Sequence, residues 1–392
     1  MEKIVFTEEF CSPQRLFPFT LTRQIQDIRV GILTIREKWE RMLDMPSYDK
    51  QEDDYKDLNN GFIIDKNIGR DIIYLIHGNI LPTPALIKQV QKLDPGEFLT
   101  VPGKENFIYC ISRKQILDPN KIKMEKAVEA TEDFKEISYP WDITRLNAWA
   151  IEQDFDLLTA KKKNQGVSRT NGVINNSRVF VEKGARAEHC VFNATEGPIY
   201  IGNGAIIMEG SFLRGPIAIC EGSVVKMGTR IYGATTVGPF STVGGEIKNS
   251  VIFGYSNKAH DGYLGDAVIG EWCNLGAGTT NSNVKNNASN IKIYTPDGQV
   301  DVGQKCGMFM GDYSRTAINT SINTGSVIGV SCNVFSSGLT PKYIPSFSWG
   351  SDGIERYDRS KALEDIHNWK KLKGQELTPT ETFLLNYIFD HY

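Results

Sequence analysis

The sequence predicts an α/β, Rossmann-like N-terminal domain over residues 1–165, a left-handed parallel β-helix over residues 173–338 and a short α-helical tail over residues 346–392. Two patterns support this prediction. Strand-like and helix-like segments alternate in the first part, and aliphatic residues recur at every sixth position in the second part. A chain of 392 residues also exceeds what one hydrophobic core normally serves, so more than one domain is expected.

Strand and helix patterns alternate along the N-terminal part. The strand candidates are Ile4–Phe6, the run IIYLIH that ends at His77 and the run FIYCIS that ends at Ser112; the helix candidates are Arg29–Leu43, Pro84–Leu93 and Pro140–Lys163. Alternation at this spacing predicts a parallel sheet that is covered by helices. The polar residues 161–172 are interpreted as the linker that follows.

Aliphatic residues recur at intervals of six in the second part. They are Ile201, Ile207, Leu213, Ile219, Val225, Ile231, Val237 and Val243. One hexapeptide forms one flat side of a triangular coil, so every sixth side chain points into the same narrow interior. Small residues follow most of these aliphatics by four positions, as expected near the corners of such a coil, where glycine supplies dihedral angles that other residues resist. An amphipathic α-helix would need spacings of three and four, so it is excluded here.

The period returns after an interruption that follows Val243, and an insertion then breaks it again. The later interior positions are Ile269, Leu275, Met310, Thr316, Ile322, Ile328 and Val334. Residues 281–300 break the period, and we expect them to form an inserted loop. In the tail, Arg359–Lys373 has helical spacing, and Thr378–Glu381 predicts a capping box that opens a last helix.

Composition excludes several classes of function. A net charge of −3 gives no general attraction to nucleic acid or to anionic membranes. No stretch of the sequence is long and apolar enough to span a membrane, and the acidic N-terminus does not resemble a signal peptide, so we expect a cytoplasmic protein. The seven cysteines contain no CxxC pair, which favours reduced thiols over a disulfide framework or a zinc site.

Polar residues gather where the six-residue period lapses, between Glu246 and Thr280. His260 lies here, close to Tyr263, Asp266 and Asn274 in the sequence. A neutral imidazole can take a proton from an attacking amine at neutral pH, a step typically worth about 10²–10⁴ in rate. The alternative is a buried structural histidine. The polar neighbours favour catalysis, because adjacent coils stack residues of this segment on one another.

Two segments resemble a known family. KAHDGYLGDAVIGEWCNLGAGTTNSN (258–283) is similar to the acetyltransferase signature of the GlmU-like bifunctional sugar-1-phosphate nucleotidylyltransferase/acetyltransferases. GMFMGDYSRTAINTSINTGSVIGV (307–330) is similar to the coils with which this family binds acetyl-CoA. The resemblance implies an N-acetyltransferase that acts on glucosamine-1-phosphate or a related amino-sugar phosphate, in the synthesis of UDP-N-acetylglucosamine.

The resemblance also implies roles for individual residues. His260 would be the general base that deprotonates the amine for its attack on the acetyl-CoA thioester. The residues implied to hold the sugar phosphate are Tyr263, Asn274, Asn283 and Lys292. Lys258 is a further candidate for this contact, with a solvated lysine as the alternative. A cation is apt there because the phosphate carries negative charge.

The coenzyme positions and the assembly follow from the same resemblance. Ala277, Asp312 and Val330 match positions that line the acetyl-CoA channel of the family, although a small residue is common where Asp312 stands. In this family the site forms between subunits, so the resemblance implies a homotrimer. The helical tail could cap the β-helix or extend the subunit interface.

The N-terminal part resembles the family's nucleotidyltransferase domain less closely. Arg15–Thr20 is similar to the end of the nucleotidyltransferase signature, but Glu8, Glu9 and Pro13 stand where the family has glycines whose backbone amides cradle a triphosphate. Asn79 stands at the usual position of a magnesium-binding aspartate, and an amide binds a hard dication less well than a carboxylate does. Mg²⁺ and UTP are therefore expected as cofactor and substrate only if this domain is active.

Besides the acetyltransferase, three further hypotheses concern this chain. Arg15 and Arg23 could bind the phosphates of a nucleotide in another geometry, and solvated surface arginines are the alternative. The domain would then be a nucleotidylyltransferase, or the whole chain a non-catalytic sugar-nucleotide-binding scaffold. A zinc carbonic anhydrase on the same β-helix is set aside, because it needs three converging histidines and the repeat region offers only His189 and His260.

Overall fold

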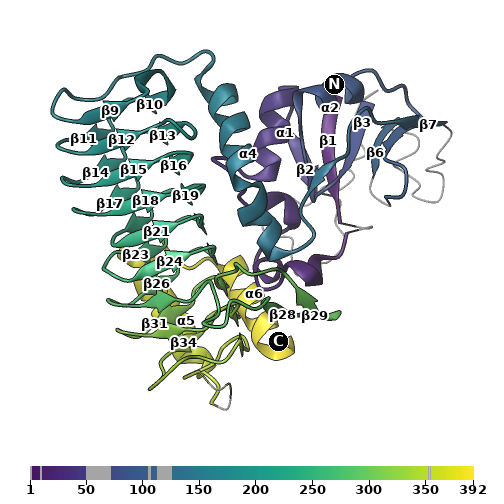
Figure 1. The fold of residues 1–392 in the computed structure, drawn as a ribbon. Coiled ribbons are helices and arrows are strands. Elements are labelled where there is room, and N and C mark those ends of the chain that lie inside the picture. Colours follow the sequence, from purple (N-terminus) through teal and green to yellow (C-terminus); the bar gives the residue numbers. More distant parts are fainter. Residues whose placement is uncertain are drawn as a thin grey trace. The chain divides into compact units, whose positions relative to one another are not determined.

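The computed structural model describes residues 2–8, 11–49, 72–104, 107–112, 126–351, 353 and 355–392. The chain forms two compact units (Figure 1). The N-terminal unit comprises Met1–Leu16, Arg23–Ile28 and Leu33–Ser138, and the β-helix unit comprises Phe17–Thr22, Arg29–Ile32 and Tyr139–Tyr392. No helix in the described part of the chain is long and apolar enough to cross a bilayer.

The N-terminal unit contains a six-stranded sheet of order β2-β1-β3-β6-β5-β7. Its strands are β1 (Glu2–Thr7), β2 (Ser47–Asp49), β3 (Ile72–His77), β5 (Glu97–Thr100), β6 (Phe107–Ser112) and β7 (Lys126–Glu129). β1 pairs in parallel with β2 and β3, but β6 is antiparallel to both β3 and β5. The prediction of a parallel sheet is therefore wrong at β6. Only residues 101–106 separate β5 from β6, and a parallel crossover needs a dozen residues or more.

Two helices and a small ribbon also lie in the described part of this unit. The helices are α1 (Ile35–Leu43) and α2 (Pro84–Val90), and the ribbon pairs β4 (Ile80–Leu81) with β8 (Lys135–Glu136). α1 opens with a capping box in which Thr34 and Glu37 bond each other's backbone amides. It is shorter than the predicted Arg29–Leu43, because residues 29–32 belong to the β-helix unit.

The β-helix has three faces, which we call A, B and C in the order in which each coil visits them. Face A consists of β10 (Val179–Val181), β13 (Ile199–Ile201), β16 (Ile217–Ile219), β19 (Thr235–Val237), β22 (Val251–Ile252), β25 (Val268–Ile269), β30 (Phe309–Met310), β33 (Val327–Ile328) and β35 (Tyr343–Ile344). Face B consists of β11 (Arg186–Ala187), β14 (Ile206–Ile207), β17 (Val224–Val225), β20 (Thr242–Val243), β23 (Asn257–Lys258), β26 (Asn274–Leu275), β31 (Arg315–Thr316) and β34 (Asn333–Val334). Face C consists of β9 (Gly172–Ile174), β12 (Val191–Asn193), β15 (Phe212–Arg214), β18 (Arg230–Tyr232), β21 (Glu246–Lys248) and β24 (Tyr263–Gly265), followed by the pair β27 (Thr280–Asn281) and β32 (Ser321–Ile322).

The interior of the coils confirms the six-residue period. All eight aliphatics from Ile201 to Val243 are 2% exposed or less. Burying such a side chain stabilises a fold by about 1.5–3 kcal/mol. The small residues at the corners are buried as well, and some tie one coil to the next: the Ser223 hydroxyl donates to the carbonyl of Gly238 at 2.8 Å. The predicted parallel β-helix is therefore confirmed.

Helix α4 (Pro140–Thr159) packs on face A of the β-helix. Its Asn147 side chain is fully buried and donates to the carbonyl of Ala234 at 2.8 Å. The predicted helix thus exists, but it belongs to the β-helix unit. The compact units consequently divide the chain differently from the predicted boundary at residue 165.

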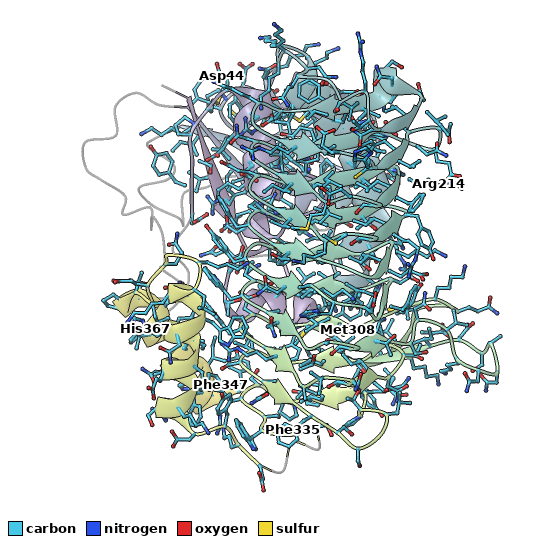
Figure 2. All side chains as sticks on the ribbon, turned by 90° about the vertical axis from the view of Figure 1, so that its left-hand side faces the viewer. Asp44, Arg214, Met308, Phe335, Phe347 and His367 are labelled. Atoms are coloured by element: carbon cyan, nitrogen blue, oxygen red, sulfur yellow. The ribbon has the colours of Figure 1, made fainter. Side chains whose placement is uncertain are left out.

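The predicted insertion contains the antiparallel hairpin of β28 (Lys292–Thr295) and β29 (Gly298–Asp301). The tail forms α5 (Arg359–Lys371) and α6 (Pro379–His391), and the predicted capping box of Thr378 and Glu381 is confirmed. In Figure 2, α5 with its His367 and the nearby Phe347 lie along the C-terminal coils of the β-helix.

The tail covers the corner between faces A and B. Phe240, Tyr255 and Trp272 stack along this corner, with ring centroids 5.2 and 4.3 Å apart. The Lys370 ammonium lies 5.0 Å from the Trp272 ring centroid and 2.5 Å from a carboxylate oxygen of Glu381. These contacts make the tail a cap on one edge of the β-helix.

Candidate active site

The corner between faces B and C changes length at one coil. Residues 226–229 connect β17 to β18, and residues 276–279 connect β26 to β27. Between them lies a short corner, in which Gly244 and Gly245 alone connect β20 to β21, and then a long corner, residues 259–262, which connects β23 to β24. The long corner has the same length as the regular corners but directly follows the short one, and the six-residue period lapses at Gly244 and Gly245.

Close packing explains the two glycines of the short corner. A Cβ atom on Gly244 would lie 2.5 Å from the carbonyl oxygen of Ala259. Gly245 has φ +77°, and a Cβ atom there would lie 2.9 Å from the carbonyl oxygen of His260. Neither position accepts a side chain unless the long corner moves.

His260 lies on the long corner, and its side chain is exposed. In the following coil, the amide of Gly278 donates to the carbonyl of Asp261 at 3.0 Å. Ala277 is therefore the neighbour of His260 one coil further on. The structure thus brings together His260, the predicted base, and Ala277, a predicted coenzyme position.

Face C next to the long corner carries a network of polar side chains. The Asn283 amide donates to the Tyr263 hydroxyl at 3.1 Å and to the Asp266 carboxylate at 2.5 Å. Burial, followed by the charge of Asp266, raises the pKa of Tyr263 to about 12, so its hydroxyl stays protonated and can donate at neutral pH. Two of the predicted sugar-phosphate residues, Tyr263 and Asn283, are thus in direct contact.

Sequence reasoning missed two cations on the same face. Strand register aligns Arg230, Glu246 and Tyr263 in successive coils, and it aligns Tyr232 with Lys248. The Tyr232 hydroxyl donates to Glu246 at 2.7 Å, a guanidinium nitrogen of Arg230 lies 3.7 Å from Glu246, and the Lys248 ammonium lies 5.6 Å from the centre of the Tyr232 ring. The sequence could have pointed to Arg230 and Lys248, because charged residues are rare in the walls of these coils.

Asn274 and Lys292 lie apart from this network. Asn274 is on face B, across the corner from Tyr263, and its side-chain oxygen accepts a long hydrogen bond of 3.5 Å from Asn257. Lys292 opens the inserted hairpin with an exposed side chain. Neither residue has a recorded contact with Tyr263 or His260 within the described part of the chain.

Lys258 corrects one expectation. Its side chain is 3% exposed and points into the coil, where the ammonium donates to the carbonyls of Gly244 at 3.0 Å and His260 at 2.5 Å. Burial lowers the pKa of this ammonium to about 8, and the charge of Asp261 opposes the shift. A sugar phosphate on the outer face would not reach a group that points inward, so we assign Lys258 no substrate contact.

Asp312 and Val330 also lie away from His260, at the corner between faces A and B. Both are buried. The Asp312 carboxylate accepts from the amide of Glu271 at 2.8 Å and from the Thr22 hydroxyl at 2.7 Å. The aspartate therefore holds a corner and an N-terminal segment together, which explains why a small residue is absent here. Because neither residue is accessible, we assign them no coenzyme contact.

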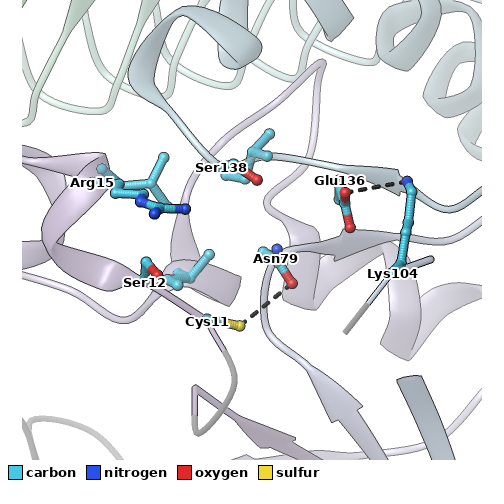
Figure 3. A pocket seen from close by; sticks show the side chains of 10 residues that line it. Cys11, Ser12, Arg15, Asn79, Lys104, Glu136 and Ser138 are labelled. Atoms are coloured by element: carbon cyan, nitrogen blue, oxygen red, sulfur yellow. Dashed lines mark hydrogen bonds and ion pairs between the residues drawn. The ribbon is translucent and has the colours of Figure 1, made fainter. Parts of the chain in front are cut away.

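The N-terminal unit has a pocket of its own, a cavity of about 190 Å³ (Figure 3). Its lining residues are Cys11, Ser12, Arg15, Leu16, Ile25, Asn79, Lys104, Glu136, Ile137 and Ser138. The Lys104 ammonium lies 3.2 Å from Glu136, and the Cys11 thiol donates to the Asn79 side chain at 3.4 Å. Arg15 is thus in the pocket, whereas Arg23 is not among its lining residues.

The residues of this pocket do not fit a magnesium ion. Glu136 is the one carboxylate of the lining and is paired with Lys104, while Asn79 offers an amide. Glu8, one of the residues that stand where the family has glycines, accepts from the amide of Ile25 at 2.7 Å; Glu9 lies outside the described residues. Within the described ranges no group of three or more histidine, cysteine, aspartate or glutamate side chains could hold a metal ion.

Comparisons with known proteins show which proteins the two parts of this chain resemble. Residues 4–163 match a family described as sugar nucleotidyl transferase. It is 27% identical to the "Bifunctional protein GlmU" of Methanocaldococcus jannaschii, over 59% of this chain and 50% of the relative. It is 30% identical to a "Bifunctional sugar-1-phosphate nucleotidylyltransferase/acetyltransferase" of Sulfurisphaera tokodaii, over 54% and 47% of the two chains.

These matches confirm the resemblance to GlmU-like bifunctional transferases. The chain spans about half the length of these relatives. Among solved structures, it matches an Arabidopsis UDP-N-acetylglucosamine acyltransferase at 12% identity and a TM-score of 0.28, over 58% of this chain and 96% of that one. A likeness at that score adds nothing to the assignment.

Proposed function

We propose that the β-helix unit transfers the acetyl group of acetyl-CoA to the amine of an amino-sugar phosphate, glucosamine-1-phosphate or a close relative. One observation carries the proposal. An exposed histidine, His260, lies on the corner after the shortened one, beside an outer face that presents two cations, Arg230 and Lys248, and a hydroxyl donor, Tyr263. An amino-sugar phosphate needs a base near its amine and cations near its phosphate, and this corner offers both.

The chemistry divides among these residues as follows. The His260 imidazole takes a proton from the amine as the nitrogen attacks the thioester carbonyl. The carbon–sulfur bond then breaks, and the proton passes from the imidazolium to the departing thiolate of coenzyme A. Arg230 and Lys248 hold the phosphate, and Tyr263 donates a hydrogen bond to the sugar phosphate. Fixing the amine beside the base lowers the entropic part of the barrier.

A homotrimer is part of the proposal. The corner of His260 also carries strongly exposed apolar side chains, Met227 at 69% and Ile318 at 70% exposure. Exposed apolar residues along one edge support an interface with further copies of the chain. A neighbouring subunit there would supply the second wall of a site that is open in the single chain.

The proposal is tested by the acceptors that the purified protein uses. Free thiol released from acetyl-CoA would be followed with glucosamine-1-phosphate, related amino-sugar phosphates and unphosphorylated glucosamine. We expect turnover with at least one amino-sugar phosphate and, because the phosphate contacts are lost, a much higher KM for glucosamine. Turnover of glucosamine with an equal kcat/KM, or no turnover of any amino-sugar phosphate, would contradict the proposal.

A second candidate function concerns the pocket of the N-terminal unit. We infer that it binds a phosphate-bearing ligand, such as a nucleotide or sugar nucleotide, without metal-dependent transfer. Arg15 and Lys104 supply positive charge, but the carboxylates that would hold Mg²⁺ are lacking. The alternative is the nucleotidylyltransferase activity for which the relatives are named.

Calorimetry with UTP and UDP-N-acetylglucosamine would test this binding. We expect measurable affinity, which Arg15→Ala abolishes and Arg23→Ala, outside the pocket, preserves. Supplying UTP, Mg²⁺ and N-acetylglucosamine-1-phosphate should release no pyrophosphate above background. Steady pyrophosphate release would favour the nucleotidylyltransferase instead.

A further inference from the structure

One position in the interior of the β-helix does not match its neighbours. Strand register places Lys258 in the column of Val225 and Val243, the column that Leu275 continues in the next coil. Its side chain is as buried as theirs. An ammonium in such an apolar interior is unfavourable because it loses hydration. Among the described residues its two hydrogen-bond acceptors are backbone carbonyls, so no carboxylate bonds the ammonium directly.

Those two carbonyls belong to the short corner and to the corner of regular length that follows it. One acceptor is Gly244 in the short corner, and the other is His260 in the long corner. A single ammonium therefore ties the shortened coil to the main chain of the residue that carries the exposed imidazole. The long corner directly follows the short one, so this tie fixes His260 from the inside.

We infer that Lys258 is a positioning residue for acetyl transfer: from inside the β-helix it holds the backbone of His260 against the Gly244–Gly245 corner and so fixes the imidazole relative to the amine. This inference rests on the proposed function of His260. A displacement of about 1 Å in a catalytic group can lower a rate by about 100-fold. Lys258 itself touches neither substrate nor coenzyme in this account.

The test replaces Lys258 with methionine, which is of similar length and lacks the charge. In the full-length protein, Lys258→Met should lower kcat for the amino-sugar phosphate by about 10- to 100-fold with KM within about twofold. Its melting temperature should be unchanged or higher, because a buried charge is removed. Lys183→Met, at an exposed lysine of the first coil, should change neither quantity.

A second readout does not depend on turnover. The chain has five histidines, so the ring signals of His260 can be assigned in the NMR spectrum of histidine-labelled protein. Lys258→Met should shift or broaden the His260 signals and leave those of His189, on the same corner in an earlier coil, unchanged. If the wild-type protein acetylates nothing, the proposed function fails, and this spectrum still decides the positioning.

Two results would overturn the inference. One is a Lys258→Met protein with wild-type kcat and unchanged His260 signals. The other is a loss of kcat that only parallels a loss of melting temperature, because Lys258 would then be a general structural residue. If Lys258→Met does not fold, Lys258→Gln keeps a donor for the carbonyls, and its kcat should then lie between background and wild type at a normal melting temperature. A folded Lys258→Gln protein at background activity would count against the inference.

Discussion

The two candidate sites depart from regular structure in opposite ways. At the corner of His260 the departures add groups: a lysine lies inside the coil, and two cations and a tyrosine lie on face C, next to a shortened corner in the coil before. In the N-terminal pocket the departures replace groups, with Asn79 at a carboxylate position and Glu136 paired with Lys104. Charged groups that cost stability and lie around one exposed histidine indicate an active site. The replacement of metal-binding carboxylates in the pocket indicates altered chemistry there.

The largest effect is expected when the short corner is widened. Gly245→Ala introduces a Cβ atom 2.9 Å from the backbone of the long corner, at φ +77°. We expect kcat for acetyl transfer to fall by about 100-fold, because the backbone of His260 must move. Gly228→Ala is the matched control: φ is +71°, but the added Cβ meets nothing within 4 Å. Both should lose about 1–3 kcal/mol of stability from the strained dihedral angle, and only the first should lose activity. Equal activity of the two variants would show that the Gly244–Gly245 corner does not position His260.

The next largest effect is expected on KM, from the loss of a cation on the outer face. Lys248→Ala should raise KM for the amino-sugar phosphate about tenfold with little change in kcat, the loss expected for one charge-assisted hydrogen bond of roughly 1.5 kcal/mol. The difference should shrink at high salt, because exposed charges are screened. An unchanged KM at low salt would mean that the phosphate binds elsewhere.

A smaller effect, on the pH dependence of stability, is expected from the buried Lys258. The folded protein lowers the pKa of Lys258 to about 8 from 10.5, so between these values the unfolded chain binds more protons. The cost of the buried charge is therefore fully present below pH 8 and is relieved as pH rises. From pH 7 to pH 9 the wild type should gain about 1 kcal/mol of unfolding free energy relative to Lys258→Met. Urea unfolding at both pH values checks this, and a constant difference would mean that the ammonium is hydrated.

The smallest effect concerns the N-terminal pocket. Asn79→Asp restores a carboxylate next to Glu136, and we expect Mg²⁺ to bind weakly where the wild type binds none. Calorimetry with Mg²⁺ alone would measure this binding, with Asn79→Ser as the control. Equal Mg²⁺ affinity in wild type and variant would show that the pocket already holds the ion, and the contrast between the two sites would weaken.

The regular coils were predictable from the sequence because one interior position repeats every six residues. The burial of the aliphatic residues from Ile201 to Val243 follows from the spacing alone, without knowing which coils are neighbours. The period fails at Gly244 and Gly245, which shorten one corner and shift the phase of everything that follows. Lys258 thus looked like a surface residue beside His260, although strand pairing with Val243 places it in the interior.

Other features depend on contacts that no local pattern encodes. Asp312 was predicted to line a coenzyme channel. Its carboxylate instead accepts a hydrogen bond from the hydroxyl of Thr22, which lies almost three hundred residues away in the sequence. Arg230, Lys248 and Tyr263 lie on the same face only because of the register between coils. His260, by contrast, is predicted as the base from polar neighbours that lie close to it in the sequence, and its role stays a prediction.

One measurement tests the central claim most directly: the rate of thiol release from acetyl-CoA by His260→Ala in the presence of the best amino-sugar phosphate. The matched control is His189→Ala, another exposed histidine on the same corner in an earlier coil. We expect His260→Ala to keep the oligomeric state and melting temperature of the wild type and to lose about 10²–10⁴ in kcat, with His189→Ala unaffected. Undiminished kcat in His260→Ala would show that this corner is not where the proton is taken.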